Sequence, residues 1–576
     1  METMPADVRG PTPSVSEDPA LGLDRRQKFE ILGAVLLALF LGALDQTVVS
    51  TAMPKILTDL DGSALYTWVI TIYLLTSTIT VPFYGKLSDL FGRKPLLMIG
   101  IGTFLVGSVL SGLSQNMEQL ILFRGLQGVG AGALFPISLA VIGDLFSPAE
   151  RGRYQGLFGA VFGLSFLLGP AIGGLLTDLV SWHWVFFVNL PIGIVSLIVI
   201  WRLLPTIKRS DATRNLDYLG AAVFTVAISF LLVGLTNKSG VSAAGLPNEW
   251  TDPTVGGFIL VALVLSAIFV AVEARAKEPI VPLGLWRDRT YASSIVSTFL
   301  LSFGFFGAVV FLPRWFQVVR GESATLSGYL LFPLLVGLIG SSIISGILVS
   351  RTGRYKAIVL AGMATMVVGL VMMTQLTATT DYVPLFAWMF VTGVGIGPTL
   401  SVFTIIVQNA VPFAQLGVAT SNLTFFRQIG GSVGLAIAGT IFGTSLQNRL
   451  PGEIVASLPA ALQPQAQAML GSGGGLGINP NDLTGVGQSF GEAVAAVTPA
   501  LRPFIANLDA GFHQAMSLSI ADTFGIGIVT TIGAFAFALA MRELPLRSTN
   551  AAEAPVGRES AEPAGQPTLR HSPATD

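Results

Sequence analysis

The stretch Gly85-Lys86-Leu87-Ser88-Asp89-Leu90-Phe91-Gly92-Arg93-Lys94 is short and charged, and it lies between two long apolar runs. Gly85 and Gly92 allow a tight reversal that bulkier residues would resist. The three basic residues favour the cytoplasmic side of a membrane. Asp89 can pair with one of these cations or face the N-terminus of a neighbouring helix. An ordinary positive-inside hairpin is the alternative, but topology alone requires neither the glycines nor the acid.

The composition of the 576-residue chain is that of a polytopic membrane protein. Apolar residues make up 52% and charged residues only 11%, against about 25% charged residues in a soluble domain. Mean hydropathy is +0.71. A net charge of −1 gives no indication of a nucleic-acid partner. There is no cysteine, and His183, His513 and His571 lie far apart, so we expect no metal site and no cofactor.

Fourteen apolar runs are long enough to cross a bilayer as helices. The first is too long for a signal-peptide core, so we interpret it as a retained span. Residues 1–28 and 542–576 are expected to be disordered cytoplasmic tails. The runs are 29–53, 66–84, 95–113, 119–142, 154–176, 184–203, 218–235, 255–272, 291–312, 326–349, 357–376, 383–407, 418–446 and 517–541.

The basic residues of the connecting segments predict the orientation. With the N-terminus inside, the inner segments hold 21 Lys and Arg residues and the outer segments hold 6. Such an excess marks the cytoplasmic side. We therefore expect a multi-pass protein of the cell inner (cytoplasmic) membrane, surrounded by the lipid bilayer, monomeric and with both termini in the cytoplasm.

An internal repeat divides the chain. The stretch 346–354 repeats the spacing of glycine and Gly-Arg found in 85–93, and Gly-Val-Gly-Ile-Gly at 393–397 resembles Gly-Val-Gly-Ala-Gly at 128–132. This predicts an all-α membrane protein of two six-helix bundles, residues 29–204 and 286–541, with two additional spans in 205–285. The second copy has lost charge, because Ser350 replaces Asp89 and Met389 replaces Arg124.

Two charges inside the first bundle are candidates for proton coupling. At a rise of about 1.5 Å per residue, Asp45 lies roughly 13 Å from the outer end of span 1, and Arg124 lies roughly 10 Å from the outer end of span 4. The two charges therefore share a depth. Charges inside spans are expensive, and pairing reduces the cost of burying either one. An arginine holds the carboxylate ionised until a proton or substrate disturbs the pair. A static salt bridge between two helices is the alternative.

Spans 5 and 6 carry further motifs. Span 5 contains Gly169-Pro170-Ala171-Ile172-Gly173-Gly174, in which the proline kinks the helix and the glycines allow close approach of another helix. We expect this bend to seal one end of the cavity, although generic small-residue packing is the alternative. Span 6 opens with residues 181–193, whose tryptophans suit the outer interface. For His183 a pH-sensing role is considered, but interface packing without function is favoured.

The second bundle offers two possible cavity charges, Arg427 in span 13 and Asp522 in span 14. Their depths differ, so we do not expect them to pair. Arg427 either faces the cavity or binds a buried carbonyl, and Asp522 either has a function or simply reaches outer water. The segment 447–516 is predicted to be a long extracytoplasmic loop, with a glycine patch at 471–477 between alanine-rich stretches. These stretches are interpreted as amphipathic helices on the outer face or as parts of a plain linker.

Together these motifs resemble the major facilitator superfamily of transporters. Residues 85–94 are similar to the family's loop between spans 2 and 3, and the Gly169-Pro170 motif is similar to its antiporter motif. Residues 182–193 resemble the span 6 signature of the family's fourteen-spanning drug/proton antiporters, with His183 in place of the usual arginine. The resemblance implies proton-driven efflux of small hydrophobic or amphipathic substrates. It also implies that Asp45 and Arg124 couple protons. The gating loop would consist of Gly85, Asp89, Gly92, Arg93 and Lys94.

Two other functions remain open at this point. An exporter of one lipid or metabolite would use residues 447–516 to hand its substrate to an extracytoplasmic partner. A membrane enzyme or receptor is disfavoured, because the chain shows no soluble domain, no nucleophile–base pair and no metal-ligand spacing.

Overall fold

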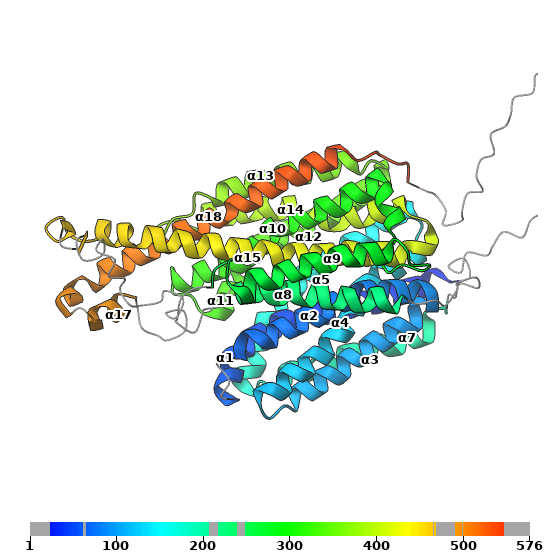
Figure 1. The fold of residues 1–576 in the computed structure, drawn as a ribbon, viewed down its shortest axis with the longest axis horizontal. Helices are drawn as coiled ribbons and strands as arrows, with labels where there is room; N and C mark the ends of the chain where they lie inside the picture. The colour runs from blue at the N-terminus through cyan, green and yellow to red at the C-terminus, as the bar shows by residue number, and fades with distance from the viewer. Residues whose placement is uncertain are drawn as a thin grey trace, which may run out of the picture.

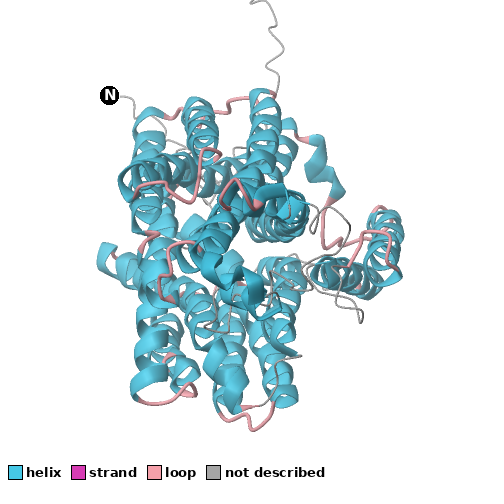
Figure 2. Cartoon of the chain, turned by 90° about the vertical axis from the view of Figure 1, so that its left-hand side faces the viewer, coloured by secondary structure: helices cyan, strands magenta, loops and turns pink. Residues whose placement is uncertain are grey.

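The computed structural model is a bundle of long helices in which the first described helix begins on the side where the last one ends (Figure 1). It describes residues 23–60, 65–206, 217–238, 248–464, 466–467, 490–497 and 499–546. Fourteen helical segments in these ranges are long and apolar enough to span a membrane, which confirms the predicted number. Figure 2 shows helices joined by short loops, without a strand in the described part.

The helices, with short 3-10 or π segments marked η, are α1 (Arg25–Asp59), α2 (Tyr66–Phe91), α3 (Arg93–Gly112), α4 (Met117–Leu145), α5 (Pro148–Leu179), α6 (Trp184–Phe187), α7 (Asn189–Leu203), α8 (Tyr218–Lys238), η3 (Pro253–Gly257), α9 (Phe258–Glu273), η4 (Leu283–Arg287), α10 (Arg289–Val318), α11 (Ala324–Tyr329), α12 (Phe332–Thr352), α13 (Lys356–Met373), α14 (Tyr382–Ala410), η5 (Phe413–Gln415), α15 (Leu416–Ser457), α17 (Phe490–Val497), η7 (Pro499–Phe504) and α18 (Ile505–Leu539). We call the side where α1 begins and α18 ends the terminal face, and the side of α17 the distal face (Figure 1).

We call helices α1 to α7 the N-terminal bundle and helices α10 to α18 the C-terminal bundle. Two buried apolar clusters lie within the first group. A third cluster draws most of its residues from the second group but also includes Phe135 of α4 and Phe158 of α5. Two seams join the bundles, α2 against α15 and α5 against α12. The additional pair α8 and α9 covers the first seam, where Phe224 and Ile228 of α8 share a buried cluster with Leu75 of α2 and Phe425 of α15. Leu260 and Leu263 of α9 are exposed, as expected for a helix that faces lipid.

The stretch 85–94 is mostly helical, so the prediction of a loop with two turn glycines is wrong at Gly85. Helix α2 continues to Phe91, and only Gly92, with φ 97°, lies between the helices. Gly85 instead provides close packing, because a Cβ there would overlap Ser421 of α15. At the other seam, Gly346 of α12 meets the backbone of Gly152 in α5 in the same way. The repeat therefore preserves a glycine contact between bundles at both seams.

Helices α15 and α18 extend beyond the predicted ends of spans 13 and 14, so the long loop is shorter than 447–516. Helix α15 continues to Ser457 and α18 begins at Ile505. Apolar side chains explain the extension, because Ile454 of α15 and Phe512 of α18 are buried in one core. The short helix α17 stacks Phe490 on Phe512, with ring centroids 4.6 Å apart. Phe490 and Val494 of α17 are thus buried against protein. The glycine patch 471–477 lies outside the described residues.

Candidate functional site

The structure brings Asp45 and Arg124 together inside the N-terminal bundle. The carboxylate Oδ2 accepts a hydrogen bond of 2.6 Å from Nη1 of Arg124. Its other oxygen accepts hydrogen bonds from Gln127 Nε2 at 2.7 Å and from Asn189 Nδ2 at 3.1 Å. The Asp45 side chain is fully buried and that of Arg124 is 2% exposed. One carboxylate therefore joins α1, α4 and α7 in a region without water contact.

Arg124 has further partners that hold its guanidinium in place. The same Nη1 donates to Gln127 Oε1 at 2.8 Å, and the ring of Tyr73 lies 4.1 Å from the guanidinium carbon. Ion–ring contacts of this kind stabilise a desolvated cation. Sequence reasoning found the pair but missed Gln127 and Asn189 as partners. Gln127 could have been found because it lies three residues after Arg124 on the same helix face. No local signal relates Asn189 to Asp45.

The physical consequence is that one ionised carboxylate ties three helices together through hydrogen bonds. Hydrogen bonds to an ionised group are roughly twice as strong as neutral ones. Breaking a buried ion pair by removing one charge costs about 3–5 kcal/mol. Protonation of Asp45 removes the negative charge that Arg124, Gln127 and Asn189 bind. Such a group can convert proton binding into a rearrangement of α1 against α4 and α7.

The Gly169-Pro170 motif links this cluster to the C-terminal bundle. Gly169 packs against Thr47 of α1, whose hydroxyl donates to Ser165 O of α5 at 3.1 Å. Gly173 also packs on α1, with Val48 O 2.8 Å from the position of a Cβ. Pro170 contacts Gly328 of α11, and Gly174 lies near Thr325 at the start of the same helix. Helix α5 thus lies between the Asp45 helix and the distal half of the second bundle.

Replacing Gly169 by alanine is expected to destabilise the protein by about 1–3 kcal/mol, because an added methyl group overlaps Thr47. Transport should fall with it, since α1 and α5 would be forced apart beside Asp45. The measurements are the melting temperature in detergent and uptake into proteoliposomes. Gly439→Ala, at an open position of α15, is the matched control and should leave both unchanged. Equal behaviour of the two variants would contradict the packing argument.

Asp89 makes both of the interactions that the sequence suggested as alternatives. It forms an ion pair with Arg93. Its two oxygens also accept hydrogen bonds from the backbone N–H groups of Gly417 at 3.0 Å and Val418 at 2.8 Å. These groups belong to the first turn of α15, where free N–H groups and the helix dipole favour a negative charge. Asp89 therefore connects the two bundles at the terminal face.

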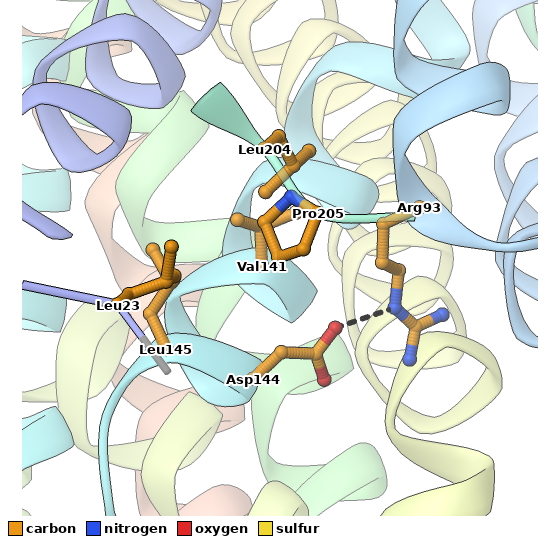
Figure 3. A pocket seen from close by; sticks show the side chains of 7 residues that line it. All are labelled: Leu23, Arg93, Val141, Asp144, Leu145, Leu204 and Pro205. Carbon is orange, nitrogen blue, oxygen red and sulfur yellow. Dashed lines mark hydrogen bonds and ion pairs between the residues drawn. The ribbon is translucent and has the colours of Figure 1, made fainter. Parts of the chain in front are cut away.

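Arg93 connects this contact to helix α4. Its Nε donates to Asp144 Oδ2 at 3.0 Å (Figure 3), and its Nη1 donates to Ser88 Oγ at 2.7 Å. Arg93 and Asp144 line a cavity of about 10 Å³. Figure 3 shows Leu204 and Pro205 beside this pair. Lys86 pairs with Glu278, which follows α9, at 2.6 Å, and Lys94 lies half-buried in the first turn of α3. The motif thus binds α4, α15 and the segment after α9 at once.

The second copy of the motif makes the equivalent contact without charge. Ser350 Oγ accepts a hydrogen bond of 3.2 Å from the backbone N–H of Arg153 near the start of α5. Gly353 follows α12 with φ 69°, as Gly92 follows α2. Between the two seams, Gln155 of α5 donates to Gln408 of α14 at 2.6 Å. Hydrogen bonds therefore hold the bundles together across the terminal half of the molecule.

Arg427 and Asp522 lie apart, in agreement with the expectation that they do not pair. Arg427 donates to the carbonyl of Leu400 at 3.4 Å, and it also lines a small cavity of about 20 Å³. Asp522 forms an ion pair with Arg449 at 3.0 Å and accepts from Ser445 at 2.5 Å. Both side chains of that pair are more than a third exposed. Asp522 therefore links α15 to α18 near the distal face.

His183 packs at the distal end of the first bundle. Its ring stacks on Trp182 with centroids 3.7 Å apart, and Nδ1 lies 2.7 Å from Ser181 Oγ. Partial burial lowers the pKa of His183, although the charge of Asp59 opposes the shift. The lowered pKa favours the neutral ring, in line with the packing role favoured from the sequence. In the described part of the chain, no group of three acidic or histidine side chains could hold a metal ion.

A fourteen-span helical protein with paired charges buried in one bundle and a charged contact between the bundles has the architecture of a secondary transporter. The family model described as Major Facilitator Superfamily matches residues 35–435. The chain belongs to this superfamily, whose members are transporters and not enzymes. With its fourteen candidate spans it fits the fourteen-spanning branch that the motifs predicted.

Relatives identified by sequence agree with this assignment. The chain is 38% identical over 456 residues to the multidrug transporter protein MdtP of Bacillus subtilis, covering 79% of this chain and 82% of that protein. It is 36% identical over 423 residues to multidrug resistance protein 3 of the same organism, covering 73% and 81%. It is also 36% identical over 542 residues to the uncharacterized MFS-type transporter Rv1877 of Mycobacterium tuberculosis, covering 94% and 73%.

Two solved structures share the fold. The human organic anion transporter MFSD10 aligns with a TM-score of 0.53 at 16% identity, covering 72% of this chain and 94% of that one. A bacterial homolog of the human lysosomal transporter Spinster, in an inward-facing and unoccupied conformation, aligns with a TM-score of 0.54 at 14% identity, covering 90% and 98%. At these identities the likeness shows the fold alone, which confirms the predicted fold class.

Proposed function

We propose that this protein is a proton-coupled exporter of small hydrophobic or amphipathic compounds, and that Asp45 carries the coupled proton. The observation that supports this most directly is the buried carboxylate held by Arg124, Gln127 and Asn189. A static pair in such a place is often no more stabilising than apolar packing, so the presence of this pair favours a working role. The substrate class rests on the likeness to two multidrug proteins.

In this proposal, the charge on Asp45 selects between two arrangements of the bundles. Ionised Asp45 holds α1 against α4 and α7. A proton weakens these bonds and leaves Arg124 without its counter-charge, so the helices shift. Because Gly169 and Gly173 pack on α1 and Pro170 packs on α11, the shift is transmitted through α5 to the second bundle. Protonation can move the equilibrium only by its differential interaction with the two states.

The terminal face is proposed to be cytoplasmic, because its segments hold most of the basic residues. The structure then has its cytoplasmic half closed by Asp89 at α15 and by Ser350 at α5. In our proposal the bundles of residues 29–204 and 286–541 move against each other around these contacts. Residues 205–285 stay attached through Lys86 and Glu278. Residues 1–28 and 542–576, which lie largely outside the described ranges, form cytoplasmic tails.

The proposal is tested with purified protein in proteoliposomes that contain a pH-sensitive dye. An imposed proton gradient should drive accumulation of a lipophilic cationic dye, and adding the dye should accelerate collapse of the gradient. Competition by unrelated apolar compounds should inhibit both. Dye transport that is identical with and without a gradient would contradict proton coupling, and an absence of competition would favour a narrow substrate range.

A second candidate is export of one bulky lipid or metabolite, and the distal extension of α15 and α18 with α17 favours it. This extension carries a buried apolar core beyond the predicted spans. It would contact an extracytoplasmic partner that receives the substrate. The first candidate needs no such structure, since a few residues suffice to join two helices.

Replacing residues 458–504 by a short Gly/Ser linker distinguishes the two candidates. Asn507 Nδ2 donates to Ser457 O at 2.6 Å, so the two cut ends are adjacent and the helices should stay paired. Loop closure costs change only slowly with length. For a multidrug exporter, dye transport should remain nearly unchanged. Loss of lipid export with normal dye transport would support the second candidate, and loss of all transport by a correctly inserted variant would contradict both.

A further inference from the structure

Arg427 is a cation inside the second bundle, and the described part of the chain places no acid against it. Within the described ranges, no carboxylate lies within ion-pair distance of its guanidinium, whereas Arg124 in the first bundle contacts Asp45. One hydrogen bond is formed, from Nη2 to Leu400 O, at the long distance of 3.4 Å. A guanidinium has five N–H donors. Most of this donor capacity therefore remains available to something bound beside it.

The cavity beside Arg427 offers one more free donor and contains no acidic residue in its lining. Thr298 Oγ1 is buried and has no hydrogen-bond partner. The other two hydroxyl groups in the cavity lining already donate hydrogen bonds. Ser302 donates to Thr298 O at 2.8 Å, and Thr399 donates to Ile396 O at 2.6 Å. A buried hydroxyl without a partner costs free energy, so such a group indicates a missing acceptor. A cation with a free hydroxyl is suited to bind an anion.

The size and the remaining lining restrict the kind of anion. A cavity of about 20 Å³ has room for one group of the size of water. Its other walls are apolar, including Leu301, Phe305 and Met366. One oxygen of a carboxylate, or one halide ion, would fit inside it, with the apolar body of a substrate outside the cavity, whereas a bulky polyanion would not fit. Phe158 of α5, with its ring 5.8 Å from the Arg427 guanidinium carbon, places the site next to the first bundle.

We propose that Arg427 and Thr298 form a subsite for a compact monoanionic group, supplied by the carboxylate of an amphipathic substrate or by a free halide. With the carboxylate as source, the inference rests on the proposed export function and narrows its substrate class. It separates two tasks between the bundles. The proton is handled at Asp45 in the first bundle, and the anionic group is bound in the second, next to α5.

Equilibrium binding to the purified full chain in lipid nanodiscs, without a gradient, tests this subsite. The probes are benzoate and its neutral isostere benzamide, and sodium chloride against sodium sulfate at equal ionic strength. The wild-type protein should bind benzoate and not benzamide at the same concentration. Arg427→Gln should weaken benzoate binding about tenfold or more, and Thr298→Val by a smaller factor. Arg449→Gln, which removes a distal arginine, should bind as the wild type does.

Each outcome decides the proposal separately from the export function. The site would be assigned to a free halide if chloride stabilised the wild-type protein more than sulfate does, if Arg427→Gln lost this difference, and if neither protein bound benzoate. Equal binding of benzoate and benzamide, or equal binding by the wild type and Arg427→Gln, would overturn the subsite. If Arg427→Gln does not fold, benzoate binding by Arg427→Lys and by Thr298→Val is compared with that of the wild type, and binding equal to the wild type in both would likewise overturn the subsite. Proton flux with a cationic dye uses no anionic group, so its failure would contradict the export proposal while leaving the binding result intact.

Discussion

Asp45→Asn is expected to reduce proton-driven export to background while the protein still folds and inserts. Asparagine has nearly the shape of aspartate and keeps an acceptor for Arg124, but it cannot bind and release a proton. The variant leaves a buried arginine without its counter-charge, at a cost of about 3–5 kcal/mol, so its melting temperature should also fall. Substrate binding at equilibrium should persist. The measurements are proton-gradient-driven uptake in proteoliposomes and melting temperature.

Two comparisons separate a proton switch from a static salt bridge. The double variant Asp45→Asn/Arg124→Gln removes both charges and should recover stability, because a neutral pair avoids the uncompensated cation. A switch predicts that export remains absent in this stable protein, whereas a static bridge predicts that export returns. Asp522→Asn, the same substitution in the exposed pair with Arg449, is the matched control and should transport normally. Uphill export at the wild-type rate by Asp45→Asn would refute the assignment.

Asp89→Ala is expected to lower the maximal transport rate about ten- to hundredfold with little change in substrate affinity. The substitution removes two charge-assisted hydrogen bonds to the first turn of α15, each worth about 1.5–3 kcal/mol. Only part of this free energy separates the closed from the open arrangement of the terminal face, so the transport rate falls by less than the full amount. The state in which the terminal face is closed should become less populated. Because the chain contains no cysteine, two cysteines can be introduced on opposite sides of this face and spin-labelled. The distance distribution between the labels then gives the population of the closed state.

The second copy of the motif supplies a graded control for this experiment. Ser350 accepts one neutral hydrogen bond from the start of α5, so Ser350→Ala should lose about 0.5–1.5 kcal/mol and slow transport less than Asp89→Ala. Asp89→Asn should lie between them, since it keeps one acceptor without the charge. A large loss of equilibrium affinity at an unchanged rate would show that Asp89 does not act on the conformational equilibrium.

Local sequence identified Asp45, Arg124 and Asp89 because each stands out from its surroundings. A charge among apolar residues is expensive in a membrane, and a rise of about 1.5 Å per residue gives its depth. Depth alone predicted that Asp45 and Arg124 could meet. The role of Gly85 was misread for a related reason, since a glycine before a charged turn looks the same in sequence whether it bends the chain or lies under Ser421 of another helix.

The sequence by itself therefore determined the fourteen spans, the two-bundle repeat and the depths of the buried charges, because these depend on hydrophobicity and spacing along single helices. The tertiary structure decided which side chains meet around each helix. Asn189 reaches Asp45 across 144 residues and Arg449 reaches Asp522 across 73. The extension of α15 and α18 likewise depends on the partner that each helix provides. Such contacts depend on the rotation of one packed helix against another, which the periodicity of a single helix does not specify.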